Sequence, residues 1–181
     1  MQFVTTRQAS QLTGLSTDKL REWTSRRALI PADIKPKRQG SPAKYTWQTI
    51  LLLRIAVTLR DRFHLELQAH RELFTNLRRG LKGTSFIALW GKSLAIQGDS
   101  GWSLVSETDT GLPEGDAILI RLASHLDALS VGFSLPHASM MPGQLDLFPA
   151  RRVAGQSEGE NTRGRGAAAY SGAGAKRRRS A

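Results

Sequence analysis

The sequence predicts an α+β protein with a mostly helical first part, a middle that combines strands with a helix, and a basic tail. Apolar residues recur at helical spacing up to about residue 80, and the spacing then changes to that of short strands. Beyond about residue 136 the periodicity stops, and Gly, Ala and Arg dominate. These patterns predict four segments, at residues 1–63, 64–83, 84–135 and 136–181.

The first segment reads as three helices separated by turn and loop residues. The predicted elements are helices at 5–13, 17–27 and 46–62, a Pro-, Gly- and Lys/Arg-rich loop at 29–45, and a further helical pattern over 65–81. Gly14 breaks the first helix, and Ser16 is placed to cap the second.

The middle segment changes period. We predict strands at 85–90, 93–97 and 102–107, with Gly91-Lys92 as a two-residue hairpin turn. An amphipathic helix is expected over 116–132, with Ile118, Leu122, Leu126 and Leu129 facing inward. Trp90 and Trp102 could line a small-molecule pocket, but a hydrophobic core is the favoured interpretation. The segment is therefore expected to serve for interaction or dimerisation.

Positive charge is concentrated at the two ends of the chain. Residues 1–62 hold 12 Lys/Arg against 4 Asp/Glu, residues 63–150 hold 6 against 9, and residues 151–181 hold 8 against 2. This asymmetry indicates a polyanionic partner, most often nucleic acid. The alternative, that the charge serves only solubility, accounts less well for its concentration.

The composition gives little support for disulfides, metal sites, catalytic sites or membrane segments. Without cysteine there is no disulfide, thiolate metal site or redox switch. Of His64, His70, His125 and His137, only His64 and His70 could form a metal-binding pair, and because six residues is a poor spacing for one helical face we interpret both as surface histidines. No catalytic set or phosphate-binding glycine motif is visible. A transmembrane run and a signal-peptide core are also missing. We expect a cytoplasmic protein that is not an enzyme and uses no cofactor or metal.

The order of elements in the first segment is that of a winged helix-turn-helix. Two helices joined by small residues and a glycine are followed by a basic loop able to form a wing, and then by a helix that closes the core. Ala9, Ser10, Thr13 and Gly14 supply the small turn residues. In this motif the second helix lies in the major groove of DNA.

Residues 3–70 resemble the DNA-binding domain of the MerR family. The resemblance rests on "LTGLSTDKLREW", on "ALIPA", and on a wing that ends in Lys44 before Tyr45, where the family usually has arginine before tyrosine. Two positions depart from the family pattern: Ala28 stands where a glycine normally follows the second helix, and Thr24 stands where an acid normally follows the aromatic residue.

The resemblance implies that Arg21 contacts DNA and that the ring of Trp23 lies at the DNA backbone. Helix-turn-helix readers usually pair, so a homodimer is expected. The candidate DNA-binding residues are Thr17, Lys19, Arg21, Trp23, Arg26, Arg27, Lys37, Arg38, Lys44 and Tyr45.

The tail contains the hydrophobic stretch "QLDLF". Its residues, Gln144, Leu145, Asp146, Leu147 and Phe148, resemble at every position the motif by which bacterial replication and repair proteins bind the sliding clamp. Pro142 and Pro149 discourage a helix or strand around it. The other interpretation is that these residues fold back as a strand onto the middle segment.

The two motifs together predict a bacterial, nucleoid-associated protein with double-stranded DNA and the sliding clamp as partners. It would act in replication or maintenance of DNA, such as that of a plasmid or mobile element, or in its regulation. The alternatives are an ordinary MerR-like transcription regulator and an antitoxin-like autoregulator, neither of which binds the clamp.

Overall fold

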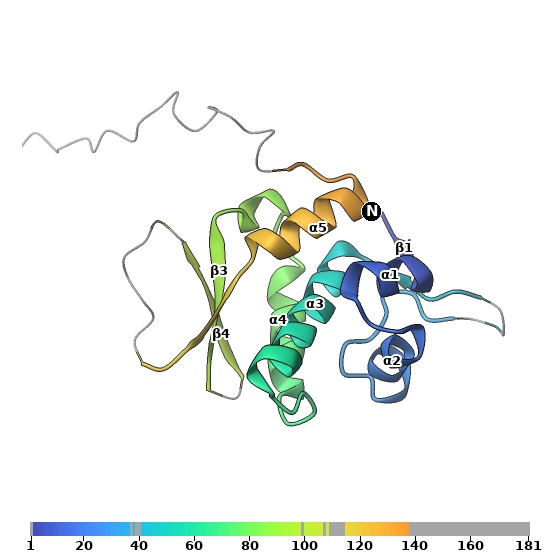
Figure 1. Ribbon diagram of the computed structural model, residues 1–181, viewed down its shortest axis with the longest axis horizontal. Helices are drawn as coiled ribbons and strands as arrows, with labels where there is room; N and C mark the ends of the chain where they lie inside the picture. The colour runs from blue at the N-terminus through green and yellow to red at the C-terminus, as the bar shows by residue number, and fades with distance from the viewer. Residues whose placement is uncertain are drawn as a thin grey trace, which may run out of the picture. The chain divides into compact units, whose positions relative to one another are not determined.

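The computed structural model describes residues 2–36, 38, 41–98, 100–106, 108 and 115–137. These residues form helices and two small antiparallel sheets, which confirms the predicted α+β class (Figure 1). From residue 138 on, the predicted tail lies outside the described residues, including the stretch Gln144–Phe148, and so does Lys37 of the predicted wing. No helix in the described part is long and apolar enough to cross a membrane.

The N-terminal elements follow the predicted order. They are β1 (Val4–Thr5), α1 (Thr6–Thr13), α2 (Thr17–Arg21), a π-helical turn η1 (Glu22–Arg26) that continues α2, β2 (Lys44–Tyr45) and α3 (Trp47–Phe63). Thr46 caps α3 by accepting a hydrogen bond from the backbone of Thr49.

The helix predicted over 65–81 is shorter than expected. His64 ends α3 in the left-handed conformation, with φ 53°, and the backbone N–H of Leu65 returns to the carbonyl of Leu59. This bond satisfies a carbonyl at the helix end and turns the chain away from the axis of α3. The next helix, α4 (Arg71–Leu81), begins six residues later than predicted, so the prediction for residues 65–70 is wrong.

The middle segment contains three strands as predicted, but one of them is a different stretch. The strands are β3 (Lys92–Gln97), β4 (Gly101–Ser106) and β5 (Ile118–Arg121), in the order β4-β3-β5. The stretch predicted as the first strand instead contains the 3₁₀ turn η2 (Ile87–Leu89). Gly91, with φ 67°, leads from that turn into β3 and does not form a hairpin; Gly98, with φ 57°, follows β3 on the way to β4.

The helix predicted over 116–132 is divided in two. Its first part is β5, which pairs with β3 from Ile118 opposite Ile96 to Arg121 opposite Ser93. Its second part is α5 (Ala123–Phe133), where Leu126 and Leu129 are fully buried as predicted. A short apolar run has no periodicity that separates strand from helix, so the partner strand decides.

One cluster of buried side chains runs through all the predicted segments up to Phe133. Helix α5 packs against both α1 and α3 (Figure 1). The contact with α1 is close: a Cβ added to Gly132 would lie 2.5 Å from Cδ2 of Leu12. Trp90 and Trp102 border this cluster, since Trp90 packs edge-on against Phe86. Residues 1–63 and 84–135 therefore share one core.

Candidate nucleic-acid interface

Local polar bonds hold the turn between α1 and α2. Gly14 takes φ 74°, and the hydroxyl of Thr13 donates to the carbonyl of Ala9 at 2.7 Å. The backbone N–H of Lys19 donates to the hydroxyl of Ser16 at 3.2 Å, which caps α2. Because these bonds satisfy groups that a turn leaves unpaired, the start of α2 is held in a defined orientation.

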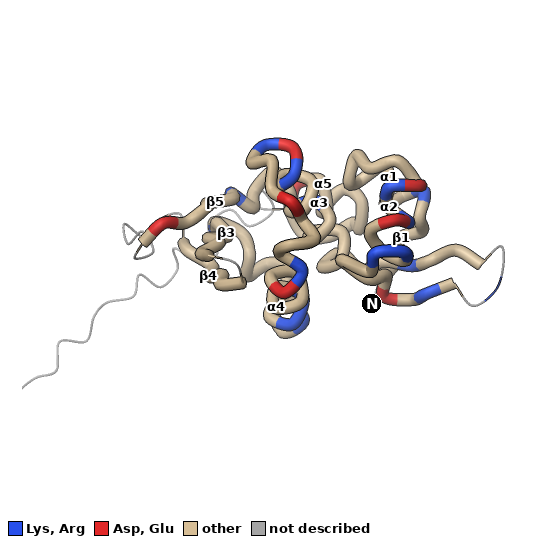
Figure 2. The backbone as a smooth tube through the Cα atoms, turned by 90° about the horizontal axis from the view of Figure 1, so that it is seen from below, with Lys and Arg blue, Asp and Glu red and all other residues tan. Residues whose placement is uncertain are grey.

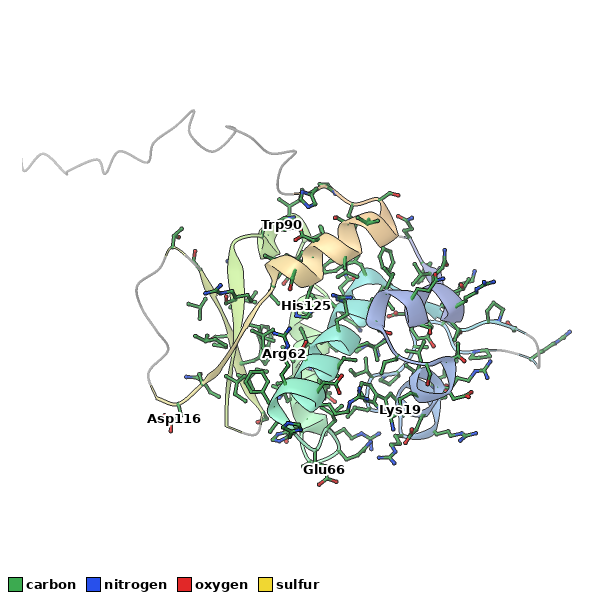
Figure 3. The ribbon with its side chains drawn as sticks, in the orientation of Figure 1. Lys19, Arg62, Glu66, Trp90, Asp116 and His125 are labelled. Atoms are coloured by element: carbon green, nitrogen blue, oxygen red, sulfur yellow. The ribbon has the colours of Figure 1, made fainter. Side chains whose placement is uncertain are left out.

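Helix α2 and η1 have one buried and one exposed face. Leu20, Trp23 and Thr24 are buried. The exposed side carries Thr17, Lys19, Arg21, Ser25, Arg26 and Arg27. Basic and acidic residues alternate along α2 (Figure 2), α1 carries one cation, Arg7, and Lys19 projects from α2 (Figure 3).

The cations of this face differ in how far they are already paired. Glu22 contacts Lys19 at 3.3 Å and Arg27 at 2.7 Å, and the hydrogen bond from Lys19 holds the pKa of Glu22 below its ordinary value. Arg21 reaches Asp18 only at 3.7 Å, and both side chains are mostly exposed. Arg21 is therefore freer than Lys19 and Arg27 to contact a phosphate or a base.

The predicted wing begins and ends on a small sheet. Strand β1 pairs with β2, Val4 opposite Tyr45 and Thr5 opposite Lys44, and Ile34 forms a bridge to Lys44 on the other side. The loop that leaves this bridge carries Arg38, whose carbonyl accepts from the backbone of Ser41 at 3.0 Å. The basic loop is thus anchored beside the start of α1.

A hollow of about 520 Å³ lies between the wing, α1 and α2. Arg7, Arg21 and Arg38 line it from three different elements, together with hydroxyl-bearing residues and Tyr45. Sequence reasoning placed Arg21 and Arg38 here but missed Arg7. A signal was available: Arg7 stands in the first turn of α1, where the helix dipole disfavours a cation.

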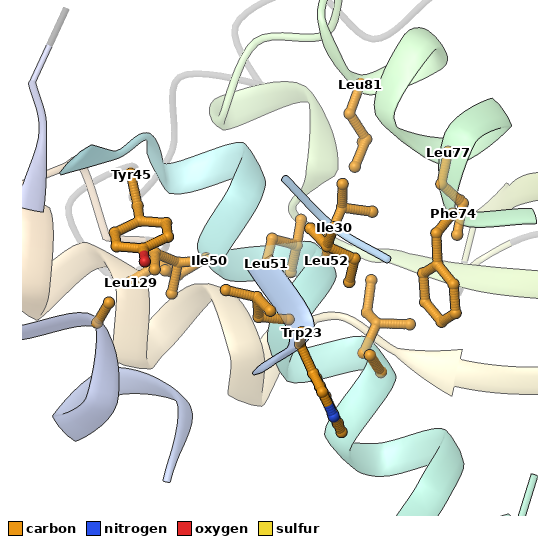
Figure 4. Packing of buried hydrophobic residues seen from close by; sticks show 14 of the residues in the cluster. Trp23, Ile30, Tyr45, Ile50, Leu51, Leu52, Phe74, Leu77, Leu81 and Leu129 are labelled. Atoms are coloured by element: carbon orange, nitrogen blue, oxygen red, sulfur yellow. The ribbon is translucent and has the colours of Figure 1, made fainter. Parts of the chain in front are cut away.

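Two predicted DNA contacts lie in the core. Only 4% of Trp23 and 1% of Tyr45 are exposed (Figure 4). The guanidinium of Arg60 covers the Trp23 ring at 5.0 Å, and the hydroxyl groups of Tyr45 and Thr24 lie 3.4 Å apart. Both rings therefore position the interface and offer DNA little side-chain surface. Thr24, which stands where MerR-like sequences normally carry an acid, is itself buried. Its hydroxyl makes an uncharged contact with the hydroxyl of Tyr45.

Asp33 is a positioning residue that sequence reasoning missed. Its Oδ2 accepts from the backbone N–H of Thr46 at 2.7 Å, and its Oδ1 contacts Nη2 of Arg78 at 3.0 Å. The carboxylate thus joins the base of the wing loop to the start of α3 and to α4. Its two partners lie 13 residues or more away in the chain, so no local pattern marks it.

Ala28 ends the second helix in the left-handed conformation, with φ 48°. Glycine adopts this conformation at little cost, whereas a Cβ makes it unfavourable. The position where MerR-like sequences normally carry glycine therefore keeps the glycine-type backbone here.

The fold and the hollow together define a winged helix-turn-helix domain of the DNA-binding class. Residues 4–77 match the model of the MerR HTH family regulatory protein, which confirms the MerR-like resemblance of the N-terminal part. The match indicates a DNA-binding regulator. No curated protein matches the chain.

Proposed function

We propose that this protein binds double-stranded DNA as a homodimer and also binds the bacterial sliding clamp. In this role it acts in the replication or maintenance of DNA, such as that of a plasmid or mobile element, or in its regulation. The observation that carries the DNA-binding part is the convergence of Arg7, Arg21 and Arg38 on one hollow of a MerR-like domain.

On this proposal α2 enters the major groove and the wing lies along the backbone. Thr17 and Arg21 face the base edges, where arginine forms its commonest specific contact with guanine. Arg38 and Lys44 contact phosphates and set the register without reading sequence. Arg7 adds a cation at the start of α1, next to backbone N–H groups that also favour an anion.

The dimer is proposed from the apolar surface of the middle segment. Ile87 in η2 is 43% exposed and Val131 on α5 is 83% exposed. A second copy could bury such residues and present two recognition helices to two half-sites. Light scattering of the full chain at micromolar concentration measures the mass directly, and a mass of one chain with one half-site bound would contradict the dimer.

The clamp part rests on the sequence of Gln144–Phe148. Leu147 and Phe148 are adjacent apolar anchors, and burying each would contribute roughly 1.5–3 kcal/mol. An extended peptide also loses conformational entropy when it docks, so one copy is expected to bind with a dissociation constant on the order of micromolar. Two copies in a dimer would bind a ring with several equivalent pockets more tightly.

Calorimetry of the full chain against the host's clamp tests this proposal. The variant Leu147→Ala with Phe148→Ala should abolish the heat of binding, whereas Val153→Ala, a matched apolar truncation outside the motif, should not. Duplex DNA affinity should be the same in all three proteins, because the helix-turn-helix is unchanged.

Absence of heat with the unmodified protein, or equal heat with the double variant, would contradict clamp binding. DNA binding without clamp binding would then favour an ordinary transcription regulator. Stoichiometric co-purification of a toxic neighbouring gene product would favour the antitoxin-like alternative.

A further inference from the structure

A second cavity, of about 640 Å³, lies between α3, β5 and α5. It shares no lining residue with the hollow beside the recognition helix. Arg54, Thr58 and Arg62 line it from successive turns of α3, and Arg121 and His125 line it from β5 and α5. Arg62 and His125 lie close together in Figure 3.

The cavity carries positive charge without a matching acid. Among the described residues no carboxylate belongs to its lining, and no ion pair involves Arg54, Arg62 or Arg121. Arg54 is half-buried, and burial lowers its pKa below the ordinary value. A cation that has lost part of its hydration and has no counter-ion favours the binding of an anion.

His125 adds a neutral polar group to this wall. It is 8% exposed, and its Nδ1 accepts from Nε of Arg54 at 3.3 Å. Burial, and then the charges of Arg54 and Arg62, lower its pKa to about 4. At neutral pH the imidazole is therefore uncharged and does not repel the arginines.

Apolar groups complete the lining. Phe63 and Leu119 are 42% and 43% exposed, large values for such side chains, and both border the cavity. The volume lies within the usual range for sites that enclose a small organic molecule. The occupant that fits this lining has an anionic group for the arginines and an apolar body for the two exposed side chains.

We propose that this cavity binds a small organic anion through Arg54, Arg62 and Arg121. Its carboxylate or phosphate group accepts hydrogen bonds from the guanidinium groups, with Ser124 as a further hydroxyl donor, and its apolar body rests against Phe63 and Leu119.

The cavity is also connected to the helix-turn-helix. Nη1 of Arg54 donates to the carbonyl of Leu12, in the last turn of α1. An anion that draws this guanidinium toward the cavity competes with Leu12 for the same donor. Occupancy is thereby linked to the position of α1, while the binding itself depends neither on DNA nor on the clamp.

Calorimetry of the full chain with three probes tests the proposal: inorganic phosphate, adenosine monophosphate and salicylate. The two organic probes represent the phosphate and carboxylate classes, and at least one of them should bind more tightly than inorganic phosphate. Arg62→Gln and Arg121→Gln each remove a charge-assisted contact and should weaken that binding about tenfold or more. Arg79→Gln, a matched change on the exposed side of α4, should have no effect.

The imidazole of His125 supplies a second readout. A bound anion offsets the field of Arg54 and Arg62, so the pKa of His125 measured by NMR should rise on saturation with the probe that binds. The proposal is overturned if no probe binds at millimolar concentration, or if the doubly substituted Arg62→Gln, Arg121→Gln protein binds as tightly as the unmodified one.

Duplex DNA is the remaining source of phosphate. The doubly substituted protein should keep its affinity for duplex DNA and the salt dependence of that affinity. If the doubly substituted protein loses affinity for duplex DNA and the salt dependence of that affinity, and no small probe binds the unmodified protein, Arg62 and Arg121 contact the DNA backbone and the proposal is overturned.

Discussion

The two basic hollows of this protein hold three arginines each, yet their surroundings differ. In the outer hollow Arg7, Arg21 and Arg38 come from α1, α2 and the wing, and all three are exposed. In the inner cavity Arg62 and Arg121 are exposed as well, whereas Arg54 is half-buried and hydrogen-bonded to Leu12 and His125. The two hollows thus differ in one arginine, Arg54, which is partly withdrawn from solvent.

The partial burial of Arg54 is what makes the inner cavity suit a different anion from the outer hollow. Exposed arginines keep their hydration and are screened by salt, so each gains little from one anion and several are needed along an extended polyanion. A half-buried arginine has already lost hydration, so a single small anion of the right shape gains more. The number and the type of the charged residues alone would not distinguish the two hollows, because each is lined by three arginines.

The largest expected effect concerns His125 in the inner cavity. Its pKa is about 4 when folded against 6.5 as its ordinary value, so the unfolded chain binds the proton more readily. The stability that this shift contributes is therefore complete above pH 6.5 and is lost as the pH falls toward 4. The difference corresponds to about 3 kcal/mol in the free energy of unfolding.

Denaturant unfolding at several pH values between 7 and 4 measures this loss. His125→Gln keeps an acceptor for Arg54 and removes the titration, so its stability should fall much less over this range. His64→Asn, which removes an exposed histidine at a left-handed position, controls for the loss of one imidazole. Parallel pH profiles for the His125→Gln and unmodified proteins would place His125 in a solvated environment and weaken the comparison.

Arg21→Ala tests the outer hollow. On the proposed binding mode this arginine contacts a base, so its loss should cost roughly 1–3 kcal/mol in binding to a footprinted site and relax the sequence preference. Arg79→Ala on α4 is the matched control. If affinity is unchanged while circular dichroism shows an intact fold, Arg21 does not contact the DNA.

The salt dependence of DNA binding tests the contrast between the hollows directly. Replacing Arg7, Arg38 and Lys44 by Gln should reduce the slope of log affinity against log salt by about 0.9 for each lost phosphate contact. Replacing Arg62 and Arg121 by Gln should leave the slope unchanged. If both sets of substitutions reduce the slope equally, the arginines of the inner cavity also contact DNA, and the distinction between the two hollows is wrong.

The smallest expected effect concerns the left-handed backbone at Ala28, which changes the stability of the protein without changing its charge. Ala28→Gly should stabilise the protein by about 0.5–1 kcal/mol, because glycine relieves the left-handed strain at the end of the second helix. Ala88→Gly, in the exposed turn η2, should instead be neutral or destabilising. Thermal unfolding measures both, and a destabilised Ala28→Gly protein would show that the strain is too small to matter.

By itself the sequence determined the elements whose signals are local. Gly14 and Ser16 mark the turn and the start of α2 because a left-handed residue and a cap act within a few residues. The basic loop and its closing Lys44-Tyr45 pair identified the wing for a similar reason. The MerR-like part of the chain was predictable from these features.

Only the tertiary structure decided which segments meet. Ile118–Arg121 became a strand because β3 offered it a partner, and Trp23 faces the core because α3 covers it with Arg60. Arg54 and Arg121 are 67 residues apart in the chain, yet they line one cavity. Such convergence depends on long-range packing and on the burial that accompanies it, neither of which leaves a periodic signal in the sequence.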